Sequence, residues 1–278
     1  MKELTVRWTI GDVSSRGYEA LRLSILGLTR LLPDARGAVT VNSVPVDEAK
    51  RRLGEVADLV DWVDSDGRAP GWLRPYLHSN FAEGVAWKFA PVRLFPDCYE
   101  LSLDNDVVLW ELPSAMEAWM SDGDSCLIAE DVACAYGQFA GVCGDQPRNS
   151  GIRGLPPGFR IDRELKAMLE SQRVLLTTEL DEQGLQVAVV TSGKHHVVSV
   201  ADVSICSPFP PHSRMLGGCG AHFVGLNAKT LPWTFQGKSG EEYLYANWDG
   251  WQPEIRSRIQ AAAANPSREY ATSNPLRS

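Results

Sequence analysis

Three acidic triplets of the form Asp-x-Asp are the residues whose type and spacing first suggest chemistry in this chain. They are Asp64-Ser65-Asp66, Asp104-Asn105-Asp106 and Asp122-Gly123-Asp124. Two carboxylates at this spacing can face one hard divalent cation, and a magnesium or manganese ion held in this way can bridge phosphate oxygens. The spacing alone decides little, because aspartate is also an ordinary turn residue.

The sequence around the middle triplet separates it from the other two. Only Asp104-Asn105-Asp106 follows a β-like run, Tyr99 to Leu103, and precedes a second apolar run, Val107 to Trp110. Open α/β sheets bind their ligands at the carboxyl ends of strands. Burial of two unpaired carboxylates would be costly unless a cation neutralised them. We therefore expect Asp104 and Asp106 to be metal ligands, with a plain turn as the alternative.

The elements that must position this triplet follow an α/β pattern from the start of the chain. Leu4 to Ile10 alternates like a strand, Gly11-Asp12 interrupts it, and Ser14-Ser15 can begin a helix. Ala38 to Val41 is strand-like, and Val46 to Val56 reads as a helix with a charged face. This βαβα order predicts one α/β domain with a mostly parallel central sheet flanked by helices.

The later segments are less regular. Asp64 to Asn80 is rich in Gly, Pro and polar residues, which predicts a loop, and Phe81 to Phe95 looks helical up to Pro91. Residues 141–160 contain eight glycines and prolines, which also predicts a loop. The other expected elements are helices over Asp162–Gln172, Glu179–Val190 and Ile255–Ala263 and a strand over Val197–Ile205. We expect one domain over residues 1–264 and a disordered tail over 265–278.

Composition narrows the class of partner and the compartment. The formal charge is −8, so binding to a nucleic-acid backbone, which needs clustered Lys and Arg, is not expected. No apolar run approaches the length of a transmembrane helix, and the first residues lack the apolar block of a signal peptide. The six cysteines form no Cys-x-x-Cys pair. We therefore expect a cytoplasmic protein with reduced thiols.

A longer motif near the carboxyl end gives the acidic triplet a context. The segment from His222 to Trp233 reads His-Phe-Val-Gly-Leu-Asn-Ala-Lys-Thr-Leu-Pro-Trp. It resembles the His-Phe-x-Gly-x-x-Lys-Pro-Trp signature of the glycogenin-like and lipopolysaccharide galactosyltransferase-like family of retaining glycosyltransferases. Here Lys229 lies one residue later than in the signature, and Thr230-Leu231 separates it from Pro232. The resemblance implies a single nucleotide-diphospho-sugar transferase domain of the GT-A type.

The resemblance implies a metal and diphosphate site. In the family the histidine is a third metal ligand and the lysine binds donor phosphate, so His222 would join Asp104 and Asp106 on Mn²⁺ or Mg²⁺. Lys229, beside the glycine turn at Gly225, would reach the diphosphate. Imidazole and carboxylates together suit manganese, and a lysine offers a point charge to the leaving group. The alternative is that His222 is a structural histidine that contacts no ligand.

Other short matches follow in the family order. Lys88 resembles a basic residue that would support the diphosphate, although a helical lysine usually lies on the solvated surface. Asn149-Ser150-Gly151 resembles an Asn-x-Gly strand entry near the sugar and acceptor. The residues Asp181, Glu182 and Gln183 resemble a helix start that contacts the donor sugar, with the functional acid at either 181 or 182. The alternative is a helix N-terminus whose acids complement the helix dipole.

The first strand and helix resemble the part of this fold that receives the nucleotide base. Gly11 and Asp12 would lie beside the base, and Tyr18 could stack on it, although an aromatic residue early in a helix more often packs on the core. Trp233, Trp248 and Trp251 could offer rings to an acceptor sugar, with the same alternative.

Together these residues predict a metal-dependent glycosyltransferase of the hexosyltransferase class. It would move a sugar from a nucleotide diphosphate sugar, for which the family's common choice is a UDP-sugar, to the hydroxyl of a carbohydrate or glycoconjugate acceptor. Retention of configuration is implied by the resemblance alone. Two alternatives stay open: a nucleotidyltransferase on the same architecture, and a non-catalytic protein that binds the nucleotide-sugar.

Overall fold

A seven-stranded sheet runs through the middle of the molecule in the order β3-β2-β1-β4-β7-β6-β8. Only β7 runs antiparallel to its neighbours, β4 and β6. This confirms the predicted α/β class with a mostly parallel sheet. The strands are β1 (Leu4–Ile10), β2 (Arg36–Val41), β3 (Asp61–Asp64), β4 (Tyr99–Asp104), β6 (Cys126–Glu130), β7 (Arg148–Leu155) and β8 (His195–Val198). The structure is a computed structural model and describes residues 3–65, 69–79, 81 and 83–264.

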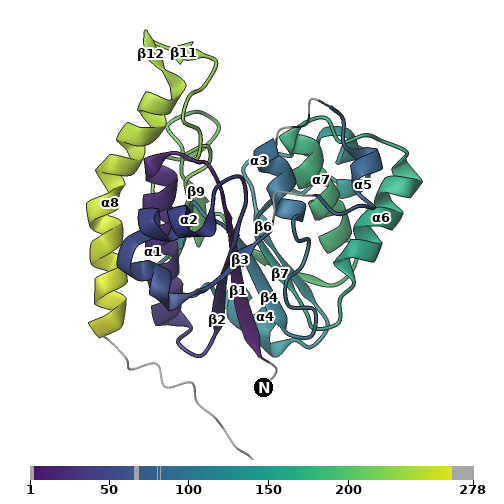
Figure 1. Ribbon diagram of the computed structural model, residues 1–278, viewed down its shortest axis with the longest axis horizontal. Coiled ribbons are helices and arrows are strands. Elements are labelled where there is room, and N and C mark those ends of the chain that lie inside the picture. The colour runs from purple at the N-terminus through teal and green to yellow at the C-terminus, as the bar shows by residue number, and fades with distance from the viewer. Residues whose placement is uncertain (1–2, 66–68, 80, 82, 265–278) are drawn as a thin grey trace, which may run out of the picture.

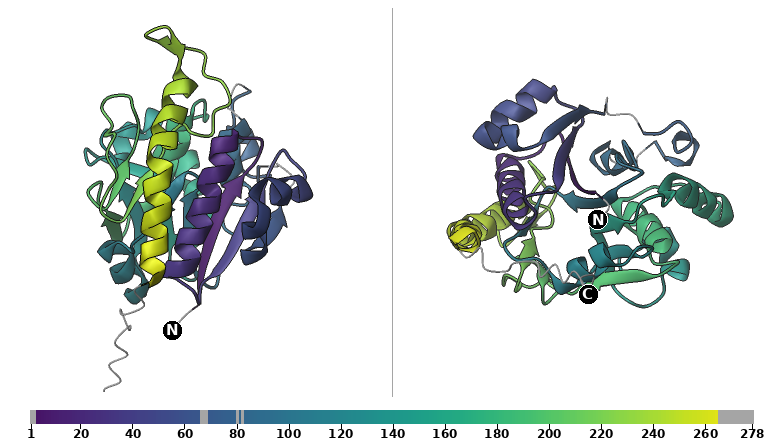
Figure 2. Two further views of the ribbon diagram at one scale, coloured as in Figure 1. Left: turned by 90° about the vertical axis from the view of Figure 1, so that its left-hand side faces the viewer. Right: turned by 90° about the horizontal axis from the view of Figure 1, so that it is seen from below.

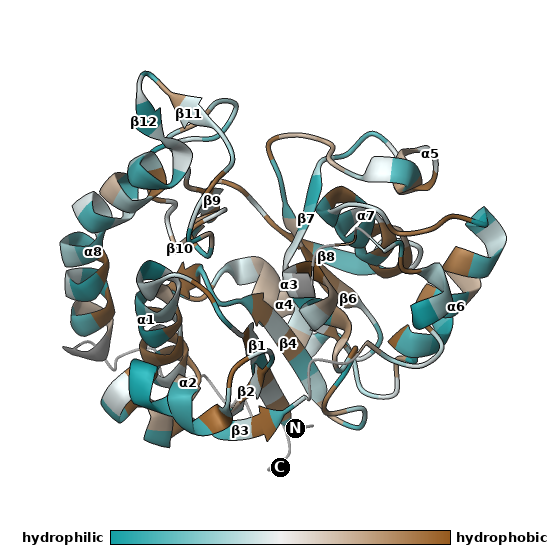
Figure 3. Ribbon diagram, turned by 45° about the horizontal axis from the view of Figure 1, so that its top comes forward, coloured by the Kyte–Doolittle hydropathy of each residue, from teal (hydrophilic) through white to brown (hydrophobic). Residues whose placement is uncertain are grey.

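Helices cover both faces of this sheet, which makes a layered α/β sandwich (Figure 1). One side carries α1 (Ser15–Leu31), α2 (Val46–Leu53) and α4 (Ser114–Ser121), and the other carries α6 (Ile161–Gln172) and α7 (Glu179–Val190). The long helix α8 (Gly240–Ala264) packs outside α1, and Figure 2 shows the two helices running side by side. Figure 3 shows that α8 is mostly hydrophilic along its outer side, as expected for an outermost layer.

The two faces of β1 differ in chemistry, and this difference positions the site. Val6, Trp8 and Ile10 point into the apolar cluster beneath α1 and α4. Arg7 and Thr9 alternate with them and therefore point to the opposite face, where Arg7 is also buried. The sheet thus has one apolar covered face and one covered face that carries polar groups close to the carboxyl ends of β1 and β4.

A second, three-stranded sheet continues from the end of β4. It contains β5 (Val107–Leu109), β10 (Gly220–His222) and β9 (Val203–Ile205), with β10 in the centre. A small hairpin of β11 (Thr234–Phe235) and β12 (Lys238–Ser239) stands at the amino end of α8 (Figure 1). The short helices are α3 (Glu83–Ala86) and α5 (Ala140–Cys143), with 3₁₀ turns over Gly54–Leu59, Arg74–Tyr76, Trp87–Phe89 and Gly137–Phe139.

The prediction of a loop over residues 141–160 is wrong, because β7 lies there and is a central strand of the sheet. Its glycines serve close approach rather than a turn. A Cβ atom on Gly151 would lie 2.4 Å from Cε1 of His222, and one on Gly154 would lie 2.7 Å from the ring of Trp119. Glycine inside a strand often marks such a contact, which composition alone cannot distinguish from a loop.

Four other elements have residue ranges that differ from the predicted ones. The single strand predicted over Val197–Ile205 is two strands in different sheets, β8 and β9, separated by a turn in which Val203 N–H donates to Ser199. Within Phe81–Phe95 only α3 and the turn Trp87–Phe89 are helical. The helix expected over Val46–Val56 ends at Leu53 and continues as 3₁₀, and β3 was not predicted. The terminal helix begins at Gly240, well before Ile255, and contains Pro253.

Two expectations extend beyond the described part of the chain. The predicted tail over 265–278 and residue Asp66 of the first acidic triplet lie outside the described residues. Among the helices that the structure describes, none is both long and apolar enough to span a bilayer.

Two helical glycines predict opposite effects on stability. A Cβ atom on Gly27 of α1 would lie 2.1 Å from the backbone oxygen of Leu109, whereas one on Gly250 of α8 would meet nothing within 4 Å. We expect Gly27→Ala to lower the free energy of unfolding by about 1–3 kcal/mol. Gly250→Ala should raise it by about 0.5–1 kcal/mol because alanine is the better helix former. Denaturant titration of both variants measures this, and equal effects would contradict the close packing of α1 on β5.

Candidate metal and donor site

The path of the chain after β4 brings the acidic triplet next to His222. β4 ends at Asp104, the chain turns through Asn105 and Asp106, and it then leaves the central sheet as β5. In the second sheet His222 of β10 lies opposite Val107, the residue that follows the triplet. The Phe223 N–H donates to the backbone oxygen of Asp106 at 2.9 Å. A residue more than a hundred positions away is thereby fixed beside the carboxylates by backbone pairing.

The three predicted metal ligands form one cluster. His222 Nε2 lies 3.3 Å from Asp106 Oδ1 and 3.7 Å from Asp104 Oδ2. One ligand atom from each of the three residues lies within 4.8 Å of the others. Two carboxylates and one imidazole are a donor set that divalent manganese or magnesium accepts. The predicted proximity of Asp104, Asp106 and His222 is therefore found.

Burial explains why this cluster fits a cation. Asp106 is 3% exposed and His222 is 5% exposed. Asp106 Oδ1 is buried and accepts no hydrogen bond of good geometry, since its contact with His222 Nε2 is 3.3 Å long. A buried carboxylate oxygen without a donor is costly, and a cation between the three side chains would satisfy it. The residues present therefore fit a divalent metal ion.

The acids also act on the neighbouring bases. Burial works against the charged form of His222, but the carboxylates of Asp106 and Asp104 outweigh it and raise the pKa of this imidazole. Burial likewise opposes the charge on Lys88, yet Asp104 and Glu182 raise the pKa of its ammonium group. The local field therefore attracts positive charge at this edge of the sheet.

Lys88 joins the cluster to the start of α7. Its Nζ lies 2.9 Å from Asp104 Oδ2 and 3.6 Å from Glu182 Oε2. Glu182 is buried, and its other oxygen accepts from Gln186 Nε2. Burial raises the pKa of Glu182, although Lys88 opposes the shift. Lys88 therefore lies within the site instead of on a solvated surface.

Asp181 and Glu182 are adjacent in sequence but have different surroundings. Asp181 forms a capping box with Thr178. Its oxygens accept from the backbone N–H groups of Gln138 at 2.9 Å and Thr177 at 2.7 Å and from the Thr177 hydroxyl at 2.8 Å. The structure therefore places Asp181 in a helix cap and Glu182 against Lys88. Gln183, the third predicted residue here, donates to the Ala135 carbonyl at 3.0 Å.

Asn149 is held at the start of β7 by two contacts. Its Nδ2 donates to Asp131 Oδ2 at 2.9 Å, and its Oδ1 accepts from the Gly151 N–H at 2.7 Å. Because Gly151 lies against His222, Asn149 belongs to the same edge of the site. Asp131 was not predicted, and nothing in its sequence context distinguishes it from other acids.

Two asparagines that sequence reasoning did not assign tie the cluster to α1. Asn105 Nδ2 donates to the Gly17 carbonyl at 3.2 Å and to Asn227 Oδ1 at 2.6 Å. Asn227 Nδ2 donates to Asn105 Oδ1 at 2.9 Å and to Asp106 Oδ2 at 3.3 Å. Asn227 lies inside the carboxyl-terminal motif, which was the available signal. Gly225, in the same loop, has a φ of 85°, a conformation that favours glycine.

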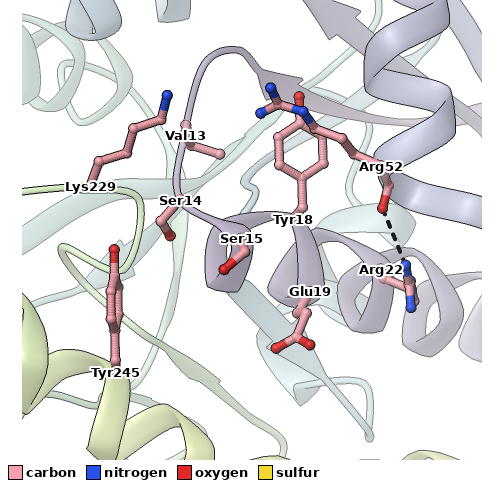
Figure 4. Close-up of a pocket in the computed structure, with 9 residues that line it drawn as sticks. All are labelled: Val13, Ser14, Ser15, Tyr18, Glu19, Arg22, Arg52, Lys229 and Tyr245. Atoms are coloured by element: carbon pink, nitrogen blue, oxygen red, sulfur yellow. Dashed lines mark hydrogen bonds between the residues drawn. The ribbon is translucent and has the colours of Figure 1, made fainter.

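Of the residues predicted to receive the base and diphosphate, Tyr18 and Lys229 line a cavity of about 640 Å³ at the start of α1 (Figure 4), whereas Gly11, Asp12, Gly225 and Lys88 are not part of its lining. Tyr18 donates from its hydroxyl to the Gly11 carbonyl at 3.0 Å, and its ring lies under the guanidinium of Arg52. Lys229 reaches the rim and lies 2.5 Å from Asp12 Oδ1. Arg52 approaches the same oxygen to 3.6 Å and was not predicted. Tyr18 is 3% exposed, so it also packs on the core.

Comparison with known proteins gives the fold a name. No family model and no curated protein matches the sequence. Among solved structures, the galactosyltransferase LgtC in complex with donor and acceptor sugar analogues has a TM-score of 0.54 at 12% identity, over 90% of this chain and 99% of LgtC. The bifunctional glycosyltransferase WbbM has a TM-score of 0.53 at 14% identity, over 93% of this chain and 52% of WbbM.

This chain has the glycosyltransferase fold of the GT-A type. The similarity holds over nearly the whole of this chain and of LgtC, and the structure of an active-site mutant of LgtC gives a TM-score of 0.51 at 13% identity. The resemblance to the galactosyltransferase-like family that the short motifs suggested is thus confirmed at the level of the fold.

The triplet Asp122-Gly123-Asp124 forms a turn outside the cluster of Asp104, Asp106 and His222. Asp122 ends α4 and accepts from Ser125 at 2.6 Å and lies 3.1 Å from Nε2 of His196. Asp124 is exposed and pairs with Lys194. The choice of the middle triplet by its strand context agrees with this arrangement.

The three tryptophans that were predicted as possible acceptor contacts differ in burial. Trp248 is fully buried, packs edge-to-face on Phe223 and belongs to the core. Trp233 is 42% exposed and packs edge-to-face on Phe209, and Trp251 donates to the Arg214 carbonyl. Of the three tryptophans, Trp233 has the most exposed ring.

The cluster predicts a cation site that depends on Asp106. Loss of a residue that only supports a metal ligand weakens metal binding by roughly 10–100-fold. We expect Asp106→Asn to weaken binding of Mn²⁺ by more than this, because it removes a charged ligand. The variant without metal should be at least as stable as the parent, since the buried charge is gone. Isothermal titration with MnCl₂ measures the first effect and thermal unfolding the second. Asp124→Asn is the matched control, and equal loss in both variants would refute the site.

The two acids at the start of α7 predict separate effects. Burial would raise the pKa of Asp181, but the hydrogen bonds from Gln138 and Thr177 outweigh it and lower this pKa to about 2. Its contribution to stability is therefore complete above about pH 4 and is lost as the pH falls through about 2. We expect Asp181→Asn to lower the free energy of unfolding at pH 7 by about 2 kcal/mol. In urea titrations this deficit should shrink below pH 4, whereas Glu182→Gln should show no such deficit. A deficit that stays constant with pH would contradict the capping role.

Proposed function

We propose that this chain is a metal-dependent glycosyltransferase that moves a sugar from a nucleotide diphosphate sugar, with UDP as the first choice, to an acceptor hydroxyl with retention of configuration. The observation that carries the proposal is the convergence of Asp104, Asp106 and His222, with a buried carboxylate oxygen that lacks a donor, at the ligand-binding edge of a GT-A fold. LgtC, which has this fold, was crystallised with donor and acceptor sugar analogues.

The donor's nucleotide would lie along the start of α1. The cavity there combines the aromatic ring of Tyr18 with the positive side chains of Arg52 and Lys229. Because Arg52 covers the Tyr18 ring, a base would have to displace this guanidinium or stack on it, and a diphosphate is attracted to lysine and arginine. Asp12 now pairs with both cations, so a diphosphate would have to replace this carboxylate as their partner. Gly11 and Gly225 would allow the backbone to approach the ligand.

The chemistry follows from where negative charge develops. Breaking the sugar–phosphate bond builds charge on the departing diphosphate, and a bound divalent cation would stabilise that charge. Asp104, Asp106 and His222 would hold the cation, while Lys229 would pair with phosphate oxygens. Lys88 holds Asp104 and Glu182 in fixed positions by its two ion pairs. Preorganised groups of this kind stabilise the transition state more than the ground state.

The sugar and acceptor would lie between Lys88 and β7. Three predicted residues would line this side. Glu182 pairs with Lys88, Gln183 donates to the Ala135 carbonyl, and Asn149 accepts from the Gly151 N–H. A buried carboxylate such as Glu182 can accept a hydrogen bond from a sugar hydroxyl. The acceptor would be a carbohydrate or glycoconjugate, and the exposed ring of Trp233 could stack on one of its sugars.

Release of nucleoside diphosphate tests the proposal. The protein is incubated with MnCl₂ and a panel of nucleotide-sugars, with and without simple saccharide acceptors, and free nucleoside diphosphate is measured. We expect release with at least one UDP-sugar, loss of at least about 100-fold in rate in Asp106→Ala, and full rate in the matched Asp124→Ala. Activity that survives Asp106→Ala would refute the metal-dependent mechanism.

The same assay separates the rival functions. Pyrophosphate formed from a nucleoside triphosphate and a sugar phosphate would indicate a nucleotidyltransferase. Metal-dependent binding of a nucleotide-sugar without any release, even to water, would indicate a non-catalytic binding protein. Either result would replace the proposed glycosyl transfer.

A further inference from the structure

Two asparagine side chains lie between the start of α1 and the acidic turn after β4. Asn105, the middle residue of the triplet, is buried, and its Nδ2 donates to Asn227 Oδ1 at 2.6 Å. Asn227 Nδ2 donates in return to Asn105 Oδ1 at 2.9 Å. The two amides thus form a reciprocal pair, called the amide pair below, that joins residues 122 positions apart in the chain.

The acceptors at the two ends of the amide pair fix how each amide is turned. Asn105 Nδ2 also donates to the Gly17 carbonyl at 3.2 Å, and Asn227 Nδ2 also donates to Asp106 Oδ2 at 3.3 Å. A backbone carbonyl and an ionised carboxylate can only accept hydrogen bonds. Turning either amide over would place oxygen against oxygen, so the hydrogen bonds themselves determine both orientations.

The contact with Asn227 divides the roles of the two oxygens of Asp106. Oδ2 accepts from Asn227, whereas Oδ1 lies 3.3 Å from His222 Nε2 in the metal cluster. A carboxylate turns easily about its terminal torsion, so a donor on one oxygen is needed to keep the other directed at the cluster. An amide does this without adding positive charge. The negative charge of Asp106 therefore stays available to a cation.

The first turn of α1 holds Asn227 in place. The Ser14 hydroxyl donates to the Leu226 carbonyl at 2.6 Å, and the Ser14 N–H donates to the Asn227 carbonyl at 3.0 Å. The absence of a side chain at Gly17 allows the close approach of Asn227, because a Cβ atom there would lie 2.5 Å from its Oδ1. The backbone and the side chain of Asn227 are thus both positioned by α1.

We propose that Asn227 is a positioning residue for the cation site, and that Asn105 and the first turn of α1 act on the site through it. Asn227 holds Asp106 so that Oδ1 is presented to the ion. It is not itself a ligand, because its Oδ1 already accepts from Asn105 and hard cations bind oxygen instead of amide nitrogen. This role rests on the metal dependence in the proposed function, and it does not require that a sugar is transferred.

Isothermal titration of the full chain with MnCl₂ tests this role without any assay of activity. Asn227→Ala should weaken Mn²⁺ binding by about 10–100-fold, which is less than the loss in Asp106→Asn, because only the support of a ligand is removed. Gln252→Ala is the matched control, since the Gln252 amide also donates to a carboxylate, that of Glu19, outside the cluster. The control should bind Mn²⁺ as the parent does. Parent affinity in Asn227→Ala would overturn the proposal.

A substitution on α1 tests the same role without removing any polar group. The methyl group of Gly17→Ala would meet Asn227 Oδ1, so this variant should also weaken Mn²⁺ binding, by about tenfold or more, although Gly17 contacts no metal ligand. Gly250→Ala places its methyl group where nothing lies within 4 Å and should leave the affinity unchanged. Full affinity in Gly17→Ala would contradict the path from α1 through Asn227.

A double-mutant cycle tests whether Asn105 acts through Asn227. Asn105→Ala alone should weaken Mn²⁺ binding, but the double variant should bind no worse than Asn227→Ala alone. Additive losses would show that Asn105 acts on the cluster by another path and would overturn this part of the proposal. Thermal unfolding without metal establishes that each variant is folded. A parent that binds no Mn²⁺ would refute the metal-dependent function as well, whereas variants that all bind like a binding-competent parent would refute the positioning role alone.

Discussion

The crowding of charge at the carboxyl end of β4 is the constraint on which the rest of this structure depends. Asp104 and Asp106 stand beside a buried imidazole, and Lys88 pairs with Asp104 from the opposite side. In a partly buried site these charges interact far more strongly than they would in water. Such an arrangement is costly unless positive charge balances it, and Lys88 supplies part of that charge. The cluster therefore fits a cation site.

The fold holds this cluster by joining three distant segments with short contacts. Ser14, the N-cap of α1, donates from its hydroxyl to the Leu226 carbonyl at 2.6 Å, and its N–H donates to the Asn227 carbonyl at 3.0 Å. Asn227 in turn bonds to Asn105. A Cβ atom on Gly17 would lie only 2.5 Å from Asn227 Oδ1, so a larger residue would push the loop away. The helix start, the acidic turn and the carboxyl-terminal loop thus form one preorganised unit, which is what charge stabilisation requires.

The sequence was informative where local pattern and chemistry agree and misleading where packing decides. The βαβα opening, the strand before Asp104 and the pairing with His222 were predictable from periodicity and motif. β7 was missed because its glycines indicate a loop by composition, while their role is contact with His222 and Trp119. Asp181 and Glu182 could not be separated, since both suit a helix start. Adjacent residues of a helix point about 100° apart, so Asp181 and Glu182 contact different segments of the chain. Only the positions of those segments show that Asp181 caps the helix and that Glu182 pairs with Lys88.

The polar face of the sheet is a second feature that could not be predicted from the sequence. Alternation in β1 identifies one apolar face, but it does not reveal whether the other face meets water or is covered. Here α7 and the segment before β4 cover it, so Arg7 and Glu100 are buried and bind backbone groups of that segment. Buried ion pairs stabilise a fold poorly compared with apolar packing. Arg7 lies one row below the register pair of Thr9 and Asp104, so the fixed charges of Arg7 and Glu100 contribute to the electric field at the cluster of Asp104, Asp106 and His222. The apolar face under α1 supplies most of the packing, and this division leaves the other face free to carry charge.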